Sequence, residues 1–489
     1  MMARARTRRY ISVGCTILLL YLIYLNISKL ASMDKTKVEV KRNGNILQVV
    51  ETEADRNHDT KKGHFIEVDG NNIEAGKRYK YRFQMMSLIL GNNQLHYKSE
   101  PMESSLLHEF SPDIENRVEN LFIDGNGTNH QLEFYVISPA ILPYKGNIMV
   151  VARVWLNYER RYKLDKADQI NRWIDNYLFS QMFDGNMKPT SPGEILGIPV
   201  PVQYVANAGC SDPKIFNWMG SLMVLFYMTM RDNKGLNIGH LFLLDYDRKI
   251  LKKPKILDHN IAQIDSNWVP LVVDDTLHFV YTMDPLRVLK CTKEQNMDIT
   301  CHFIKSIDTT LEKYPFNQNT DFLHGGSSFL PYKKSYYINV ALSTLSYKDN
   351  QNSTSPLYGA HIVLLKAYPF RIVYVSERLR IHPDLYNNIP IVRNNFIRYP
   401  FFHPFGLIVE NSDTIDIGIH INDYRSFIVR VTGIETVLDD AIATDSRSGD
   451  SIVTSQPRNI QEFVKLSLQK SHLKQKWKIQ NENGKEIVS

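Results

Sequence analysis

The sequence predicts an all-β chain, a five-bladed β-propeller, from three observations. Of its 489 residues, 43% are hydrophobic and 22% charged, so the chain can bury a large core and is not disordered throughout. Apolar runs with period two recur between turn residues, and helical periodicity is confined to about 166–182. Several segments also repeat one pattern: a polar or Gly/Pro-marked opening, an apolar strand, a short turn and a strongly apolar strand.

The repeated segments lie at 137–155, 210–230, 265–285, 324–344 and 403–423. Their spacing of about 55 to 80 residues leaves room for four strands and their loops, which is the content of one propeller blade. A two-sheet sandwich is the alternative, and it explains five similar hairpins less well. In a propeller the inner strands begin around one channel, so we expect functional residues in the first few positions of each segment.

Charge and hydropathy divide the chain along its length. Residues 1–9 form a basic arm, and 10–26 lack Asp, Glu, Lys, Arg and His, which predicts a membrane-spanning signal anchor. A cleaved signal peptide is the alternative, although no convincing small-x-small cleavage site follows. We predict a stem with an attached subregion at 27–130, the propeller as catalytic domain at 131–435, and a C-terminal tail at 436–489.

The anchor also predicts the compartment. The basic arm stays in the cytosol, so the rest of a single-pass type II membrane protein lies in the lumen of the Golgi or endoplasmic reticulum. Net charge is +6, of which the arm supplies four arginines, and the near-neutral remainder argues against a nucleic-acid partner.

In an oxidising lumen, cysteines can form disulfides and Asn-x-Ser/Thr sequons can be glycosylated. Cys291 and Cys301 flank a polar loop and are predicted to pair, which leaves Cys210 as a buried thiol. The alternative, in which Cys210, Cys291 and Cys301 are all reduced, is expected only if the predicted membrane orientation is wrong. Asn126 and Asn352 each begin an Asn-x-Ser/Thr sequon and are predicted glycosylation sites.

The openings of the repeated segments, together with the ends of some strands, carry residue types that suit a sugar bearing an anionic group. Carboxylates supply acid–base chemistry, Arg and Lys bind phosphate oxygens, and an indole covers the apolar face of a pyranose. The candidates are Arg153, Asp212, Lys214, Asn267, Trp268, Asp284, Arg287, His324, Gly325, Gly326, His403 and Asp423.

Five motifs follow one another in a fixed order. They are Gly-Cys-Ser-Asp-Pro-Lys at 209–214, Asn-Trp-Val-Pro at 267–270, His-Gly-Gly-Ser-Ser at 324–328, Tyr-Pro-Phe-Arg at 368–371 and the segment 406–431. Together they resemble the β-mannoside phosphorylase and mannosidase superfamily and the related β-1,2-mannosyltransferases of eukaryotic parasites. The resemblance covers about 131–432, and it implies a five-bladed propeller with one essential Asp.

The resemblance also implies roles for the candidates on the first two segments. Asp212 would be the proton donor and acceptor, working through a sugar hydroxyl, with a turn-capping Asp as the alternative. Arg153 matches an arginine that contacts phosphate or sugar, although an ordinary surface Arg is equally expected. Lys214 stands where the family usually has Arg, so it keeps the charge and loses the bidentate fork.

On the later segments the sequence departs from the family. Asn267 and Trp268 match a Lys-Asn-Trp motif in which Ser266 replaces the Lys, and His324 replaces an Arg before the Gly-Gly pair. These losses weaken the case for phosphorolysis. Arg287 is expected to contact an anion, and a salt bridge to Asp284 is the alternative. Asp423 is expected to contact the sugar, and a hydrogen bond between blades is the alternative.

The predicted activity is inverting transfer of mannose between a donor, either a sugar 1-phosphate or a nucleotide sugar, and a glycan acceptor. Glycoside phosphorylase, β-mannoside hydrolase and non-catalytic glycan-binding propeller remain the alternatives. We expect no cofactor and no metal, because no Cys/His set has zinc spacing. Asp245 and Asp247 have the spacing of a metal-binding pair, but a turn after an outer strand explains them better.

Overall fold

The computed structural model describes residues 38–51, 79–119, 134–156, 176–199, 208–257, 267–304, 322–348, 354–389, 399–448 and 460–469, apart from 44–45, 92–93, 232–236, 295–297 and 388. The predicted anchor at 10–26, Asn126, Ser266 and Asn352 lie outside the described residues. Two compact units are present, Met1–Glu74 and Ala75–Ser489. In the first, β1 (Val38–Asn43) and β2 (Ile46–Glu51) form an antiparallel hairpin.

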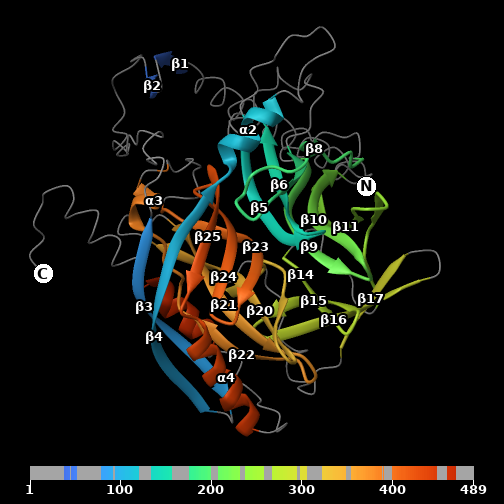
Figure 1. The fold of residues 1–489 in the computed structure, drawn as a ribbon, viewed down its shortest axis with the longest axis vertical. Helices are drawn as coiled ribbons and strands as arrows, with labels where there is room; N and C mark the ends of the chain where they lie inside the picture. Colours follow the sequence, from blue (N-terminus) through green and yellow to red (C-terminus); the bar gives the residue numbers. More distant parts are fainter. Residues whose placement is uncertain are drawn as a thin grey trace, which may run out of the picture. The chain divides into compact units, whose positions relative to one another are not determined.

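The second unit is built from antiparallel meanders, and each repeated segment forms the first hairpin of one of them (Figure 1). The first meander contains β5 (Phe134–Tyr144), β6 (Asn147–Leu156), β7 (Asn176–Phe183) and β8 (Glu194–Ile195). The second contains β9 (Gly209–Trp218), β10 (Ser221–Arg231), β11 (Asn237–Asp245) and β12 (Ile250–Lys252). The third contains β14 (Val269–Val273), β15 (Thr276–Met283), β16 (Leu286–Lys293) and β17 (Ile299–Phe303), with β13 (Lys255–Ile256) parallel to β17.

The last two meanders are joined by a hairpin from the N-terminal side of the unit. β18 (Phe322–His324) and β19 (Leu330–Lys333) pair with β20 (Tyr336–Lys348), followed by β21 (Thr354–Lys366) and β22 (Arg371–Ser376). The other meander contains β23 (Phe402–Asn411), β24 (Thr414–Ile421) and β25 (Arg425–Thr432). The long hairpin of β3 (Lys80–Gly91) and β4 (Gln94–Glu109) pairs with β22 on one side and β25 on the other.

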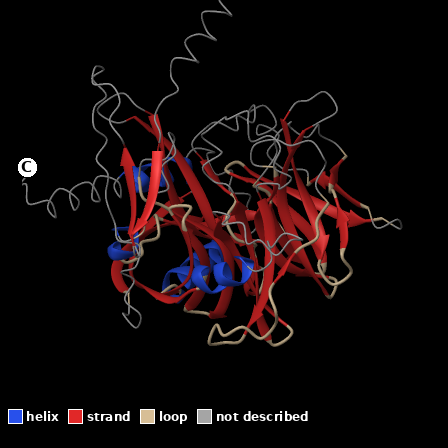
Figure 2. Cartoon of the chain, turned by 90° about the horizontal axis from the view of Figure 1, so that it is seen from above, coloured by secondary structure: helices blue, strands red, loops and turns tan. Residues whose placement is uncertain are grey.

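Among the residues that the structure describes, helices are few and short (Figure 2). They are α2 (Ser111–Glu119), α3 (Pro383–Asn387), α4 (Glu435–Ser448) and a segment at 460–469. α4 packs on β3 and β22. The predicted β class is confirmed for this part of the chain. None of the described helices is both long enough and apolar enough to cross a membrane.

Tight turns explain why the repeated segments form hairpins. Lys145–Gly146, Met219–Gly220 and Asp274–Asp275 all have positive φ at both positions, between 47° and 77°. This is the geometry of a type I′ turn, whose twist matches that of antiparallel strands. Gly, Asn and Asp adopt it at low cost, so the polar turn letters in the sequence indicate real strand connections.

The core lies between neighbouring meanders. Val151 and Val224 belong to one apolar cluster between the first and second meanders, and Leu243 and Phe279 to another between the second and third. Further clusters join the third to the fourth and the fifth to the first. β23 also contacts β20 and β21. Cys291 of β16 and Cys301 of β17 form a disulfide, and Cys210 is buried as a free thiol.

Candidate active site

The first strands of several meanders begin with the same local distortion. Ser138, Asp212, Asn267 and Gly325 all have positive φ, between 52° and 75°. In β5 and β9 the strand register shifts at Ser138-Pro139 and at Asp212-Pro213, because a proline has no N–H to donate to the neighbouring strand. Backbone in this region is strained for a side chain other than glycine, and such strain is concentrated at functional sites.

Asp212 is the centre of the group that the structure brings together. Its side chain is 45% exposed, and its Oδ1 lies 3.9 Å from Nη1 of Arg153. Ser138 Oγ donates a hydrogen bond to the same Oδ1 at 3.5 Å. The carboxylate is therefore open to a ligand on one side and held by a cation and a hydroxyl on the other.

Arg153 is fixed in place by its own neighbours. Its Nε donates to Asn176 Oδ1 at 2.7 Å, and Asn176 in turn donates to the Ala208 carbonyl at 3.2 Å. The guanidinium carbon lies 4.5 Å from the centre of the Trp155 ring. These contacts use Nε and one face of the guanidinium, and Nη1 lies on the side of Asp212.

Lys214 is a buried lysine beside Asp212. Only 4% of the residue is exposed, and no hydrogen bond or ion pair connects it to any residue that the structure describes. Burial lowers the pKa of Lys214, and the charge of Asp212 partly offsets that effect. An anion bound beside Lys214 would favour the charged form of its amine.

His324 lies close enough to Lys214 for the lysine to influence its pKa. Its Nε2 lies 3.0 Å from Thr344 Oγ1. Burial, with a contribution from Lys214, lowers the pKa of His324 to about 4, so the ring is neutral at pH 7. The adjoining Gly325 and Gly326 have positive φ, and a Cβ at Gly326 would lie 2.0 Å from the Val340 carbonyl oxygen. This pair is required for the loop to lie against β20.

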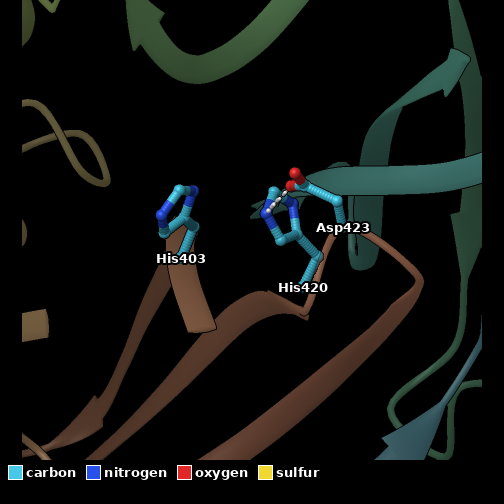
Figure 3. Close-up of side chains that lie close together, drawn as sticks. All are labelled: His403, His420 and Asp423. Carbon is cyan, nitrogen blue, oxygen red and sulfur yellow. Dashed lines mark ion pairs between the residues drawn. The ribbon is translucent and has the colours of Figure 1, made fainter. Parts of the chain in front are cut away.

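A second set of side chains, His403, His420 and Asp423, lies on the last meander (Figure 3). Burial and the nearby His420 lower the pKa of His403 to about 3; Asp423 opposes this shift and His324 adds to it. Burial acts to raise the pKa of Asp423, but His420, His403 and Arg153 outweigh it and hold the value at about 2. Ser138 connects this set to Asp212, because its Oγ donates to Asp212 Oδ1 and its backbone N–H donates to His420 Nδ1.

These three side chains have the ligand types of a metal site, but their hydrogen bonds favour another role. The backbone N–H of Ser138 donates to His420 Nδ1 at 3.0 Å. Nδ1 is therefore an acceptor, and the proton of the neutral ring is on Nε2, which faces Asp423 Oδ1 at 3.0 Å. A nitrogen that carries a proton has no lone pair for a cation, so His420 Nε2 is better placed as an ion-pair neighbour of Asp423 than as a metal ligand.

Three predicted residues have other surroundings, and a fourth, Asn267, lies beside Gly325. Trp268 is 2% exposed and packs against Phe279 and Tyr281 in the core, so it presents no face to a sugar. Asn267 Oδ1 would lie 3.3 Å from a Cβ at Gly325. Asp284 accepts a hydrogen bond from the backbone N–H of Gln461, and Arg287 lies opposite Thr282 in the β15–β16 ladder.

Asp284 therefore lies at the start of the helix at 460–469, and its environment predicts a pH dependence of stability. Burial raises its pKa to about 7 from 3.8, although the Gln461 hydrogen bond opposes the shift. The folded chain keeps a proton that the unfolded chain releases, so the free energy of unfolding falls as pH rises from about 4 to about 7. The loss is at most about 4 kcal/mol.

Asp284→Asn should remove this pH-dependent loss, because the amide does not ionise and its oxygen can still accept from Gln461. Urea unfolding of both chains at pH 4.5, 6 and 8 tests this expectation. The variant should gain stability over the wild type as the pH rises. An equal decline in both chains between pH 4.5 and 8 would show that Asp284 is not the group responsible.

Sequence reasoning missed Ser138 and His420, and also the partners Asn176, Thr344 and Tyr358. The ring of Tyr358 lies 4.7 Å from that of His403. Ser138 and His420 do lie within the repeated segments, close to Pro139 and Asp423 respectively. The signal that could have found Ser138 is its match to Asp212, since both precede a proline at the opening of a segment.

No protein-family model matches the chain. Beta-mannosyltransferase 2 of Komagataella phaffii is 28% identical over 120 residues, which is 22% of this chain and 18% of that protein. The predicted family resemblance is confirmed. Among solved structures, a mannose phosphorylase from Leishmania mexicana, in complex with phosphate ion, is 13% identical with a TM-score of 0.34, and 61% of this chain and 83% of that chain are covered. A GDP-mannose-dependent mannosyltransferase from Leishmania mexicana is 10% identical with a TM-score of 0.34. That match covers 61% of this chain and 86% of the other chain.

Proposed function

We propose that the chain is a mannosyltransferase that moves mannose, with inversion, from a phosphate- or nucleotide-linked donor to a glycan acceptor. The observation that carries the proposal is Asp212, a half-exposed carboxylate with Arg153 at 3.9 Å and the buried cation Lys214 beside it. The named activity of the Komagataella relative supports mannose as the sugar. The match spans 18% of that relative, so donor and acceptor are part of the proposal.

In the proposed reaction, the carboxylate of Asp212 handles the proton, and Arg153 and Lys214 bind the leaving phosphate. The acceptor hydroxyl attacks the anomeric carbon of mannose as the bond from that carbon to the donor phosphate oxygen breaks on the opposite face. The acceptor proton passes to Asp212, directly or through a sugar hydroxyl, and the leaving phosphate takes the negative charge under Arg153 and Lys214. His324 and His403 are neutral at pH 7, so they serve as hydrogen-bonding groups and leave the cationic role to Arg153 and Lys214.

Two structural proposals accompany this function. The first is that the five meanders form a closed five-bladed propeller, which the core clusters between consecutive meanders and the contacts of β23 with β20 and β21 support. The second is that the site lies in the lumen of the secretory pathway, with 10–26 as the anchor. The Cys291–Cys301 disulfide supports an oxidising compartment.

The test is turnover by the purified full-length chain with mannose 1-phosphate, GDP-mannose or a synthetic β-mannoside, each with and without a mannan acceptor. We expect acceptor-dependent release of phosphate or GDP. Release of free mannose from a β-mannoside without an acceptor would show a hydrolase instead. Retained binding of mannan with no turnover of any donor would show a glycan-binding module.

A further inference from the structure

A continuous series of contacts connects Asp212 to residues behind it. Ser138 Oγ donates to Asp212, the Ser138 backbone N–H donates to His420 Nδ1, and His420 Nε2 faces Asp423. Ser138 is 0% exposed and His420 is 2% exposed. The series therefore runs from the open carboxylate of Asp212 into the protein interior, and each step joins two different strands or turns.

His420 is held at both ends of its ring. The Ser138 N–H bond fixes Nδ1 as the acceptor, and Nε2 lies 3.0 Å from the Oδ1 atom of an Asp423 carboxylate whose pKa is about 2. Asp423 therefore stays charged across the physiological range. A flip of the ring would break the hydrogen bond at Nδ1 and move Nε2 away from Asp423.

The segment that His420 contacts is strained. Ser138 has φ 56°, and it lies where the β5–β6 register shifts. β24 approaches this bulge so closely that a Cβ at Gly418 would lie 2.3 Å from the Pro139 carbonyl oxygen. A serine remains in this conformation only where its surroundings fix it. The bond from its N–H to His420 is a direct constraint of that kind.

We propose that His420 is a positioning residue for Asp212, and that it acts by holding Ser138 in the conformation that presents the serine hydroxyl to the catalytic carboxylate. The inference rests on the proposed function of Asp212 and adds to it a named support that the sequence did not reveal. Asp423 contributes by fixing which nitrogen of His420 carries the proton.

Four full-length variants test the proposal. His420→Phe keeps the ring volume and removes the acceptor, while Ser138→Gly keeps the backbone conformation and removes the hydroxyl. We expect each to lower kcat about 10- to 100-fold with little change in KM, because a misplaced acid–base group affects the transition state. The double variant should be no worse than the more severe single variant, because both changes break one series of contacts. His420→Gln, which retains an acceptor oxygen, should keep more activity than His420→Phe.

Two further measurements complete the design. His278→Phe is the matched control, because His278 is also 0% exposed but contacts Thr276 and Tyr368 on another meander; it should retain the wild-type kcat. Hydrogen–deuterium exchange over 134–144 should become faster in His420→Phe and stay unchanged in His278→Phe. The exchange result needs no turnover, so it decides whether His420 holds Ser138 even if no donor is used by the wild type. Unchanged exchange in His420→Phe, additive losses in kcat, or wild-type kcat in Ser138→Gly would each overturn the proposal.

Discussion

Asp212→Asn is expected to lower kcat for mannosyl transfer by about 10²- to 10⁴-fold, the range for loss of a general acid–base group. The substitution is close in shape, and asparagine accepts the positive φ of 52° that this position requires. Folding and KM should therefore change little. Rates with a saturating donor, together with thermal unfolding, provide the measurement.

The chain offers a matched control for this substitution. Asp275 also has positive φ, 58°, but it lies in the turn between β14 and β15. Asp275→Asn repeats the chemical change in the same backbone conformation and should leave kcat at the wild-type level. If Asp212→Asn keeps full activity while the wild type turns over, the acid–base role belongs to another group.

Lys214→Met is expected to have opposite effects on stability and activity. The charge of Lys214 is buried without an ion pair among the described residues, and burial lowers its pKa, so an apolar side chain of similar length should stabilise the fold by about 1–3 kcal/mol. Activity should fall by at least about 10²-fold in kcat/KM, because the leaving phosphate loses a cation placed beside it. Urea unfolding and steady-state kinetics measure the two effects on the same sample.

Lys290→Met is the control, because Lys290 is exposed on β16 and its charge is solvated in either state. It should change neither quantity. A destabilised Lys214→Met protein would mean that the lysine has a structural role. Unchanged turnover would remove it from the proposed phosphate contacts. An increase in stability combined with a loss of activity is expected only if the protein keeps this cation for its ligand.

Much of the fold could be predicted from local pattern, because period-two runs and turn letters act over a few residues. All five repeated segments form hairpins in the structure, and Asp212, Arg153, His324, His403 and Asp423 are brought into one site. The segment openings occupy equivalent places in successive meanders, and within a hairpin the end of the second strand lies beside the opening of the first. Short-range repetition was therefore enough to group these residues.

The remaining features depend on long-range packing that local sequence does not encode. The role of His420 depends on its hydrogen bond from Ser138, where β24 packs against the β5 bulge. Trp268 could stack on a sugar as far as the sequence shows, but the structure buries it against Phe279. The capping of 460–469 by Asp284 joins residues 177 positions apart. Neither periodicity nor motif spacing carries information about such pairings.

The position of the β3–β4 hairpin has a consequence for biosynthesis. β4 at Gln94–Glu109 is synthesised early, but its partner β25 ends only at Thr432. β3 is likewise synthesised long before its partner β22. On the ribosome these early strands have open edges through most of translation, and such edges invite pairing with other chains. A shortened recombinant chain that begins at 131 would leave β22 and β25 with the same open edges. Expression should therefore retain residues from 79 onward, and maturation of the nascent chain is expected to depend on chaperones until its last strands emerge.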